Sequence, residues 1–212
     1  MSNSQNKQRI KHHKTLRQTP SQTVGPFFSY SLTPEQYAYD YNSLVNGFLI
    51  DDDSEGERIF ITGNIYDGKG QSIPDALIEI WHCDGKGNYR LEPINRKNGG
   101  FRGFGRLGTG TDVNHRFLFT TVKPGCVEGH APHINVILFM RGSLHALYTR
   151  LYFSDEAAAN SRDELLQAIP PERRKTLIAQ RKEFAGGTAY HYDVHMQGEY
   201  ETVFFDVHDH EQ

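Results

Sequence analysis

The sequence contains little cysteine, no large excess of charge of one sign and no long hydrophobic run. Its two cysteines, Cys83 and Cys126, form no CxxC pair, so a disulfide scaffold is not expected. The 23 basic residues nearly balance the 26 acidic ones, which argues against a nucleic-acid-binding protein. No apolar run approaches the roughly 18 to 20 residues that cross a bilayer, and the N-terminus has no apolar signal segment. We therefore expect a cytoplasmic protein with no nucleic-acid or membrane partner.

Self-contained catalytic motifs are also absent. The sequence has no nucleophile elbow, P-loop, dinucleotide fingerprint, HExxH motif or paired CxxC motifs. Its one compositional oddity is a count of eleven histidines, and imidazole is the commonest protein ligand for metals. Four of them lie in the polar ends of the chain, where solvated side chains are expected: His12, His13, His208 and His210. Any metal site would therefore draw on the remaining histidines.

The 212 residues divide into three regions. Residues 1–18 carry basic side chains, no acidic ones and few aliphatic ones, which predicts a mobile N-terminal arm. Residues 19–57 form an extended segment whose tyrosines favour packing against the body and which ends in an acidic link. Residues 58–212 form the body. A chain of this length can bury enough surface to fold without a disulfide or a structural metal.

The body is expected to be mainly β. Short β-branched and aromatic runs that end in Gly- and Asp-rich turns predict seven strands, at residues 59–66, 76–81, 117–121, 134–140, 147–153, 190–196 and 201–205. This pattern is typical of a β-sandwich or barrel. Residues 87–116 are glycine-rich and irregular, which predicts a long functional or partner-facing loop. Helices are predicted only at 155–168 and 172–184.

Several side chains in or beside the predicted strands could carry chemistry. His133 opens an apolar strand three residues after His130, and it is either a metal ligand or a hydrogen-bonded structural histidine. Tyr89 follows a glycine-rich turn and could bind a ferric ion or simply pack as an aromatic residue. Arg141 and Arg150 accompany apolar strands, where a guanidinium could bind a substrate carboxylate or pair with a carboxylate of the protein.

Four motifs, in order along the chain, identify a family. They are Thr19-Pro20-Ser21-Gln22-Thr23-Val24-Gly25-Pro26-Phe27-Phe28, Pro74-Asp75-Ala76-Leu77-Ile78-Glu79-Ile80-Trp81, Ala131-Pro132-His133-Ile134-Asn135, and Gln197-Gly198-Glu199 before Glu201-Thr202-Val203-Phe204-Phe205. With these motifs the chain, from Thr19 onward, resembles the intradiol ring-cleavage dioxygenases, and more narrowly their alpha-type subunits. Several motifs in the same order are far more specific than any one of them.

The resemblance implies an intradiol-dioxygenase-type β-sandwich with long loops and one or two short helices in its C-terminal half. It also implies a homologous beta subunit as partner, contacted by residues 19–57, with αβ units assembled into a larger oligomer. In such enzymes, 3,4-dihydroxybenzoate, a small aromatic acid, is cleaved with O2 to 3-carboxy-cis,cis-muconate. The resemblance places the non-haem Fe(III), bound by two tyrosines and two histidines, in the partner beta chain.

Only part of that ligand set is present here. By the resemblance, Tyr89 matches the first tyrosine and His133 matches the first histidine of a His-x-His motif. The second histidine is Asn135, the second tyrosine falls near Val127, and His130 replaces an arginine of the catalytic chain. An amide and an aliphatic side chain cannot supply the imidazole and phenolate that a ferric ion needs. We therefore expect no metal and no catalytic residue in this chain, with Tyr89 and His133 as vestigial ligand positions.

The resemblance instead implies that this chain forms part of the substrate pocket of the beta subunit. The matching positions are Thr23, Gly25, Pro26 and Arg141. The hydroxyl of Thr23 can donate a hydrogen bond, Gly25 lets the backbone approach the substrate, and Pro26 fixes the turn. The guanidinium of Arg141 would bind the carboxylate of the aromatic acid.

Two alternatives remain open. One is a self-sufficient intradiol dioxygenase with a rearranged ferric site, which the missing His-x-His motif argues against. Such a site would draw on Tyr89, His130, His133 and either Tyr148 or Tyr152. The other is a non-catalytic β-sandwich scaffold, which would not require Thr23 or Arg141 at the matched positions.

Overall fold

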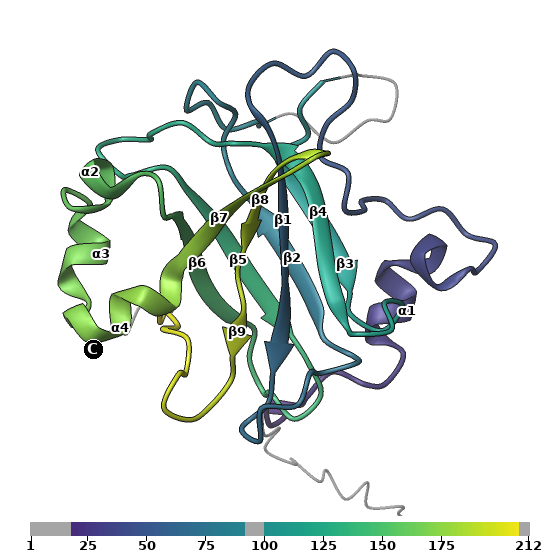
Figure 1. Cartoon of the computed structure of the whole chain (residues 1–212). Coiled ribbons are helices and arrows are strands. Elements are labelled where there is room, and N and C mark those ends of the chain that lie inside the picture. Colours follow the sequence, from purple (N-terminus) through teal and green to yellow (C-terminus); the bar gives the residue numbers. More distant parts are fainter. Residues whose placement is uncertain (1–17, 92–99, 208–212) are drawn as a thin grey trace, which may run out of the picture.

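The computed structural model describes residues 18–91 and 100–207 (Figure 1). The predicted arm at 1–18, except for its last residue, lies outside the described residues, as do the histidines of the two chain ends: His12, His13, His208 and His210. Within the described residues, no helix is both long enough and apolar enough to cross a membrane.

Nine β-strands are found in the described part of the chain. They are β1 (Arg58–Tyr66), β2 (Leu77–Trp81), β3 (Phe104–Gly108), β4 (Arg116–Val122), β5 (His133–Phe139), β6 (Leu147–Phe153), β7 (Ile178–Phe184), β8 (Gly187–His191) and β9 (Val194–His195). The strands lie in the order β3-β2-β5-β6-β7-β8-β1-β4, and β9 pairs with β1. The expected mainly β fold is confirmed.

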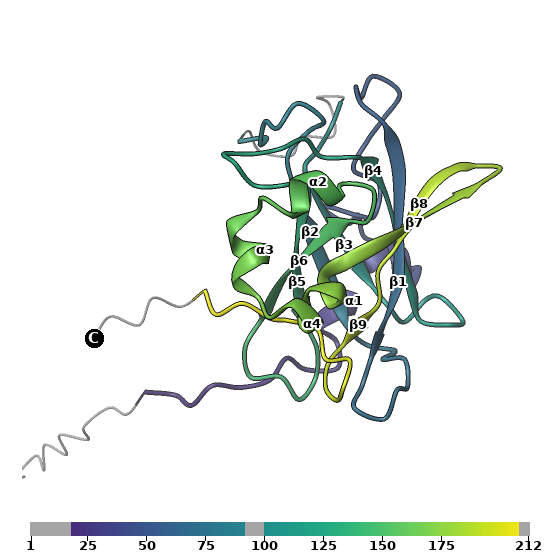
Figure 2. The same ribbon diagram turned by 60° about the vertical axis from the view of Figure 1, so that its left-hand side comes forward.

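The strands form two layers that share β7 (Figures 1 and 2). One layer contains β2, β3, β5 and β6, and the other contains β1, β4 and β8. The first two residues of β7, Ile178 and Ala179, pair with β6, whereas the rest of β7 pairs with β8. A strand that passes from one sheet to the other in this way makes a corner of the sandwich.

The hydrophobic core lies between the two layers, because alternate residues of each strand point inward. In β5, Ile134, Val136 and Leu138 are buried in this core. His133 and Asn135 therefore belong to the opposite face of the sheet. Since β2 and β6 are the neighbours of β5, their outward residues form rows with these two on the outer face of the sheet, where His133 and Tyr152 are nevertheless buried.

The segment before β1 packs onto the body. It contains α1 (Phe28–Leu32) and a 3-10 helix, η1 (Pro34–Tyr37). The side chain of Gln36 makes two hydrogen bonds with the backbone of Gly108 in β3, donating to its carbonyl at 2.6 Å and accepting from its N–H at 2.8 Å. Leu49 is completely buried in the core. The segment is thereby fixed along the β3 edge of the sandwich.

The helices in the second half of the chain are shorter than the sequence predicts. They are α2 (Ala157–Asn160), α3 (Glu164–Ala168), α4 (Pro171–Arg174) and the 3-10 helix η2 (Lys175–Leu177), and they lie beside β6 and β7 in Figure 1. The helix predicted at 155–168 is two helices, since Asp163 caps a new helix by accepting from the N–H of Leu166 at 2.8 Å. The helix predicted at 172–184 is wrong beyond Leu177, where β7 follows.

One loop prediction and two strand predictions also need correction. The irregular loop predicted at 87–116 contains β3, whose glycines hide the strand pattern. The predicted strand at 190–196 is divided between β8 and β9, and 201–205 makes only one isolated bridge, between Phe205 and Tyr148. The glycine at position 105 has a packing reason, because a Cβ there would lie 2.5 Å from a methyl group of Leu49.

Candidate functional site

Arg141 lies in the turn that follows β5. Its Nε donates to the carboxylate of Asp75, which lies just before β2, the neighbouring strand of β5. The side chain of Arg141 is still 57% exposed, so the guanidinium is oriented at the surface rather than enclosed. An oriented and exposed guanidinium can bind the planar carboxylate of a ligand.

Thr23 contacts the backbone on both sides of Arg141. Its hydroxyl accepts from the N–H of Gly142 at 2.7 Å and donates to the carbonyl of Met140 at 3.4 Å. The N-terminal segment is held nearby by the rings of Phe28 and Phe139, whose centroids are 5.5 Å apart. The structure therefore brings together two predicted pocket residues that are far apart in the sequence.

Gly25 and Pro26 lie in the turn between Thr23 and α1. Both are exposed, and the carbonyl of Gly25 accepts from the N–H of Phe28 at 3.2 Å. A Cβ at position 25 would meet no atom of the described residues within 4 Å, so none of them requires a glycine there. An exposed backbone without a side chain is suited to close contact with another molecule.

The predicted vestigial ligand positions lie elsewhere, on the outer face of the layer that contains β2, β5 and β6. His133 and Asn135 are both on β5, at positions that share this outer face. Tyr89 follows β2 and comes within 3.4 Å of the side-chain nitrogen of Asn135 through its hydroxyl oxygen. The structure thus brings three of the four aligned positions into one cluster.

Tyr89 is placed by the tight turn that precedes it. The carboxylate of Asp84 accepts from the N–H groups of Lys86 and Asn88, each at 2.9 Å, and so closes this turn. The ring of Tyr89 then packs on that of Trp81, with 4.6 Å between centroids. Burial raises the pKa of the Tyr89 hydroxyl above its ordinary value, which keeps it protonated at neutral pH.

His133 is almost completely buried. Its Nδ1 lies 2.8 Å from the carbonyl oxygen of Ala131, and its ring is 5.9 Å from the ring of Tyr152 on β6. Burial lowers the pKa of His133 to about 4, so its ring is neutral at pH 7. A neutral ring whose Nδ1 bonds the backbone is a packed structural histidine, although it keeps the Nε2 that a metal would use.

This cluster does not fit a ferric ion. Asn135 supplies an amide and Val127 an aliphatic side chain where the implied ligand set has an imidazole and a phenolate. His130, which could have compensated, instead lies 3.2 Å from the carboxylate of Asp163 through Nδ1. Across residues 18–91 and 100–207, no group of three or more histidine, cysteine, aspartate or glutamate side chains could hold a metal.

Two carboxylates that the sequence did not single out prove important. One is Asp75, although it lies inside one of the recognised motifs. The other is Asp163, which is completely buried and accepts from the N–H of Ala131 and the hydroxyl of Tyr152 as well as capping α3. Burial alone would raise the pKa of Asp163, but these donors outweigh it and lower the pKa. The ion pair of Asp75 has no signal in the local sequence, whereas Asp163 before Glu164 is an N-cap pattern that predicts the start of a helix.

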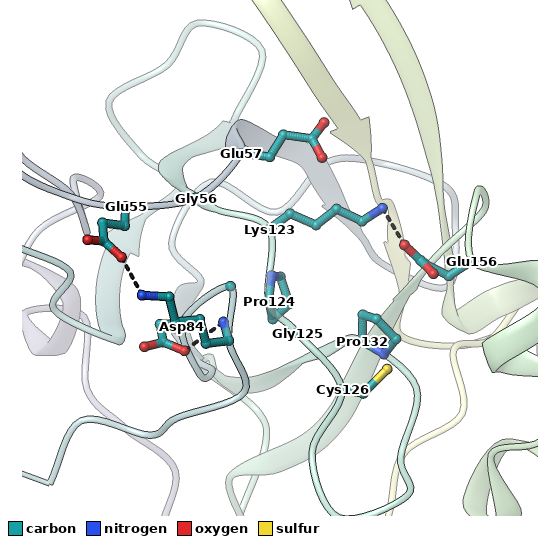
Figure 3. A pocket seen from close by; sticks show the side chains of 12 residues that line it. Glu55, Gly56, Glu57, Asp84, Lys123, Pro124, Gly125, Cys126, Pro132 and Glu156 are labelled. Carbon is teal, nitrogen blue, oxygen red and sulfur yellow. Dashed lines mark hydrogen bonds and ion pairs between the residues drawn. The ribbon is translucent and has the colours of Figure 1, made fainter.

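A cavity of about 520 Å³ lies beside the turn that precedes Tyr89, and Asp84 and Lys86 of that turn line it together with Cys126 and Pro132 (Figure 3). None of the predicted site residues lines it. Both of its lysines are already paired with carboxylates of the same cavity, since Lys86 bonds Glu55 at 2.5 Å and Lys123 bonds Glu156 at 2.6 Å. Of its other two carboxylates, Glu57 lies 3.7 Å from Arg181 and Asp84 accepts from backbone N–H groups.

The chain is similar to known dioxygenases in sequence and in structure. It matches the model of the family described as Dioxygenase over residues 25–198. It is 49% identical to the protocatechuate 3,4-dioxygenase alpha chain of Burkholderia cepacia, over 91% of this chain and 99% of that one. It is 28% identical to the protocatechuate 3,4-dioxygenase beta chain of the same species, over 79% of this chain and 74% of that one.

A solved structure supports the fold independently. It is the dioxygenase domain of a dioxygenase carbohydrate-binding protein fusion from Streptomyces sp. SirexAA-E. The TM-score is 0.59 at 22% identity, over 87% of this chain and 99% of that one. This structural similarity shows that the two chains share a fold.

Proposed function

The chain belongs to the intradiol dioxygenase family, and from this premise we propose that it is the alpha-type subunit of an enzyme that cleaves 3,4-dihydroxybenzoate with O2 to 3-carboxy-cis,cis-muconate. Its identity to an alpha chain, 49%, is well above its 28% identity to a beta chain. One structural observation carries the proposal. Thr23 bonds the residues on both sides of Arg141 at an exposed edge, where a second chain could complete a pocket.

The iron in this proposal belongs to a homologous beta chain, and αβ units assemble into a larger oligomer. The family implies non-haem iron, but Asn135 and Val127 leave this chain without a sufficient set of ligands. A ferric ion in the partner would bind the two ring hydroxyls and make the ring open to attack by O2. This chain then binds and orients the substrate.

Arg141 selects the substrate in this proposal. Its guanidinium donates hydrogen bonds to the ring carboxylate, while the Asp75 contact holds the side chain in one direction. Once the beta chain covers the pocket, the guanidinium N–H groups that do not bond Asp75 need an acceptor, so a ring that lacks the carboxylate binds less well. The pocket would therefore prefer 3,4-dihydroxybenzoate to unsubstituted catechol.

Thr23, Gly25 and Pro26 form the second part of the proposed pocket wall. Thr23 fixes the turn that carries Arg141, and the exposed backbone at Gly25 and Pro26 can approach the ring of the substrate. Because this segment is anchored on β3 and β5, the partner meets a preformed surface.

One observation favours a second candidate, the non-catalytic scaffold. Arg141 already has a carboxylate partner in this chain, Asp75, and such a pair could serve structure alone. The two candidate functions differ in what Arg141 does during turnover. If Arg141 binds the substrate, replacing it impairs substrate binding. If the chain is only a scaffold, replacing Arg141 leaves the kinetics unchanged.

The decisive experiment compares three preparations of the full-length chain. These are the chain alone, the chain with its beta partner, and the same complex carrying Arg141→Ala. Ring cleavage and iron content are measured for each. We expect no cleavage and no stoichiometric iron for the chain alone, activity with iron in the complex, and a raised KM with unchanged iron in the variant complex.

Two results would contradict the proposal. Stoichiometric iron in the isolated chain, with the red colour of tyrosinate bound to Fe(III), would favour the self-sufficient dioxygenase. An unchanged KM in the Arg141→Ala complex would leave only the scaffold role.

A further inference from the structure

The guanidinium of Arg150 lies beside the cluster of vestigial ligand positions, Tyr89, His133 and Asn135. Arg150 lies on β6, directly opposite Asn135 of β5, on the outer face of the sheet. Its Nε donates to the side-chain oxygen of Asn135 at 3.1 Å. Its Nη1 is buried and has no hydrogen-bond acceptor among the described residues. A buried guanidinium nitrogen without an acceptor is uncommon and calls for an explanation.

The amide of Asn135 is fixed in the orientation that serves Arg150. Its nitrogen donates to the carbonyl of Trp81 at 3.2 Å and to the hydroxyl oxygen of Tyr89 at 3.4 Å. The amide oxygen is thereby left to accept from the guanidinium. Asn135 therefore links the guanidinium of Arg150 to the hydroxyl of Tyr89. It does so from the position at which the implied ligand set has its second histidine.

The remaining members of the cluster surround the same charge. His133 pairs in register with Tyr152. This pair lies two positions from the pair of Asn135 and Arg150, with the inward pair of Ile134 and Leu151 between them. The positive charge of Arg150 acts on Tyr89, His133 and Tyr152. No carboxylate forms an ion pair with Arg150 within the described ranges, and the carboxylate of Asp163 reaches the cluster only through the hydroxyl of Tyr152, at 3.2 Å.

We propose that the Arg150 guanidinium is a built-in cation of this cluster, which excludes a metal ion even where the missing histidine is restored. The inference rests on the proposed correspondence of Tyr89, His133 and Asn135 to ligand positions, but not on the identity of any partner or substrate. Arg150 would then oppose metal binding in addition to the missing ligands, because its fixed positive charge lies among the side chains that a metal would contact.

Two physical effects would act together. A guanidinium stays protonated at all accessible pH values, so its repulsion of a metal cation cannot be relieved by losing a proton. In addition, a histidine at position 135 would offer its ring nitrogen lone pair to the nearby Nε–H, and this is the lone pair that a metal requires. Restoring the ligand alone therefore leaves both the charge and the competing donor in place.

The test uses the full-length chain and Co(II) as the probe. Three variants are compared: Asn135→His, Asn135→His with Arg150→Met, and Asn135→His with Arg150→Lys. Methionine keeps the aliphatic bulk without the charge, whereas lysine keeps the charge. Binding is measured by equilibrium dialysis with elemental analysis, and by the visible absorption of cobalt with nitrogen and oxygen ligands.

We expect the methionine double variant to bind about one Co(II) per chain, at least about 100-fold more tightly than Asn135→His alone. The lysine double variant should behave like Asn135→His. Near-UV circular dichroism and a cooperative melting transition establish that each variant is folded, and Arg150→Gln replaces Arg150→Met if that variant does not fold.

The proposal is overturned if Asn135→His alone binds Co(II) as tightly as the neutral double variant. It is also overturned if the folded neutral double variants gain no binding, or if lysine restores binding as well as methionine does. These outcomes are separate from the proposed function, since ring cleavage by the wild-type chain with its beta partner does not enter the measurement.

Discussion

Arg141 donates through Nε to the carboxylate of Asp75, and this contact joins the turn after β5 to the segment that leads into β2. The two strands are adjacent and antiparallel, so their ends place these residues side by side. An exposed ion pair contributes little to stability, commonly below about 1 kcal/mol. The contact with Asp75 instead orients Arg141, because it holds the guanidinium of a long side chain in one direction before a ligand binds.

Replacing Arg141 should affect substrates with a carboxylate selectively. In the complex with the beta chain, we expect Arg141→Ala to raise the KM for 3,4-dihydroxybenzoate roughly 30-fold, which corresponds to about 2 kcal/mol. Cleavage of catechol, which has no carboxylate, should change much less. Steady-state kinetics with both substrates measure the difference, and Arg141→Lys, which keeps the charge without the planar fork, should be intermediate. Equal losses for both substrates would contradict a carboxylate-binding role.

Replacing Thr23 should loosen the turn that carries Arg141. Thr23→Val keeps the shape of the side chain but removes the acceptor of the Gly142 N–H, whereas Thr23→Ser keeps the hydroxyl. One lost hydrogen bond is worth about 1 kcal/mol, so we expect Thr23→Val to raise the KM of the complex about 5-fold and Thr23→Ser to leave it nearly unchanged. Iron content should not change. A matching loss in the serine variant would show that the hydroxyl is not the relevant group.

Removing the carboxylate of Asp163 should destabilise the fold without a direct effect on the pocket. Asp163→Ala leaves the N–H groups of Ala131 and Leu166 without their acceptor in a buried position. We expect the free energy of unfolding to fall by about 3 kcal/mol, measured by urea denaturation. The exposed neighbour Glu164 provides the control, since Glu164→Ala should stay within about 0.5 kcal/mol of the wild type.

Stability should fall in mild acid because of a buried histidine. His82 is fully buried between the carbonyl of Cys83 and the hydroxyl of Thr121, and burial lowers the pKa of His82 from 6.5 to about 4. The unfolded chain therefore binds more protons between these two pH values. Stability is complete above pH 6.5 and is lost as the pH falls toward 4.

The size of this effect can be measured with a variant that does not titrate. Between pH 7 and pH 5, His82 should account for about 2 kcal/mol of lost unfolding free energy. Urea denaturation at both pH values should show a smaller loss for His82→Gln than for the wild type. An equal pH dependence in the two proteins would assign the loss to other groups.

The fold was predictable where side chains alternate and unpredictable where a strand depends on its neighbours. The run that became β5 has alternate apolar residues, and its burial follows them. By contrast, β7 consists largely of exposed polar residues with good helix propensity, and its pairing with β6 and β8 overrides that preference. Gly105 interrupts the apolar pattern of β3 because Leu49 leaves no space for a side chain.

The candidate site was predictable from the resemblance but not from local patterns. Thr23 and Arg141 were identified by motif matches, whereas their link through Gly142 and Met140 depends on the folded chain. The sequence shows Arg150 only as a basic residue in an apolar strand. From the sequence alone, the partner of its guanidinium could be a carboxylate of a ligand or a carboxylate of the protein. Its observed partner is the amide oxygen of Asn135, a contact that follows from strand register.

The position of β7 in both layers has a consequence for how the protein unfolds. Separating the layers breaks the pairing of β7 with β6 or with β8, and it also exposes the core that both layers bury. The two sheets should therefore behave as a single cooperative unit, with their slowest-exchanging amide protons sharing one opening free energy. A mutation that weakens one face of the sandwich then lowers the stability of the whole body, including the strands that carry Arg141 and Arg150.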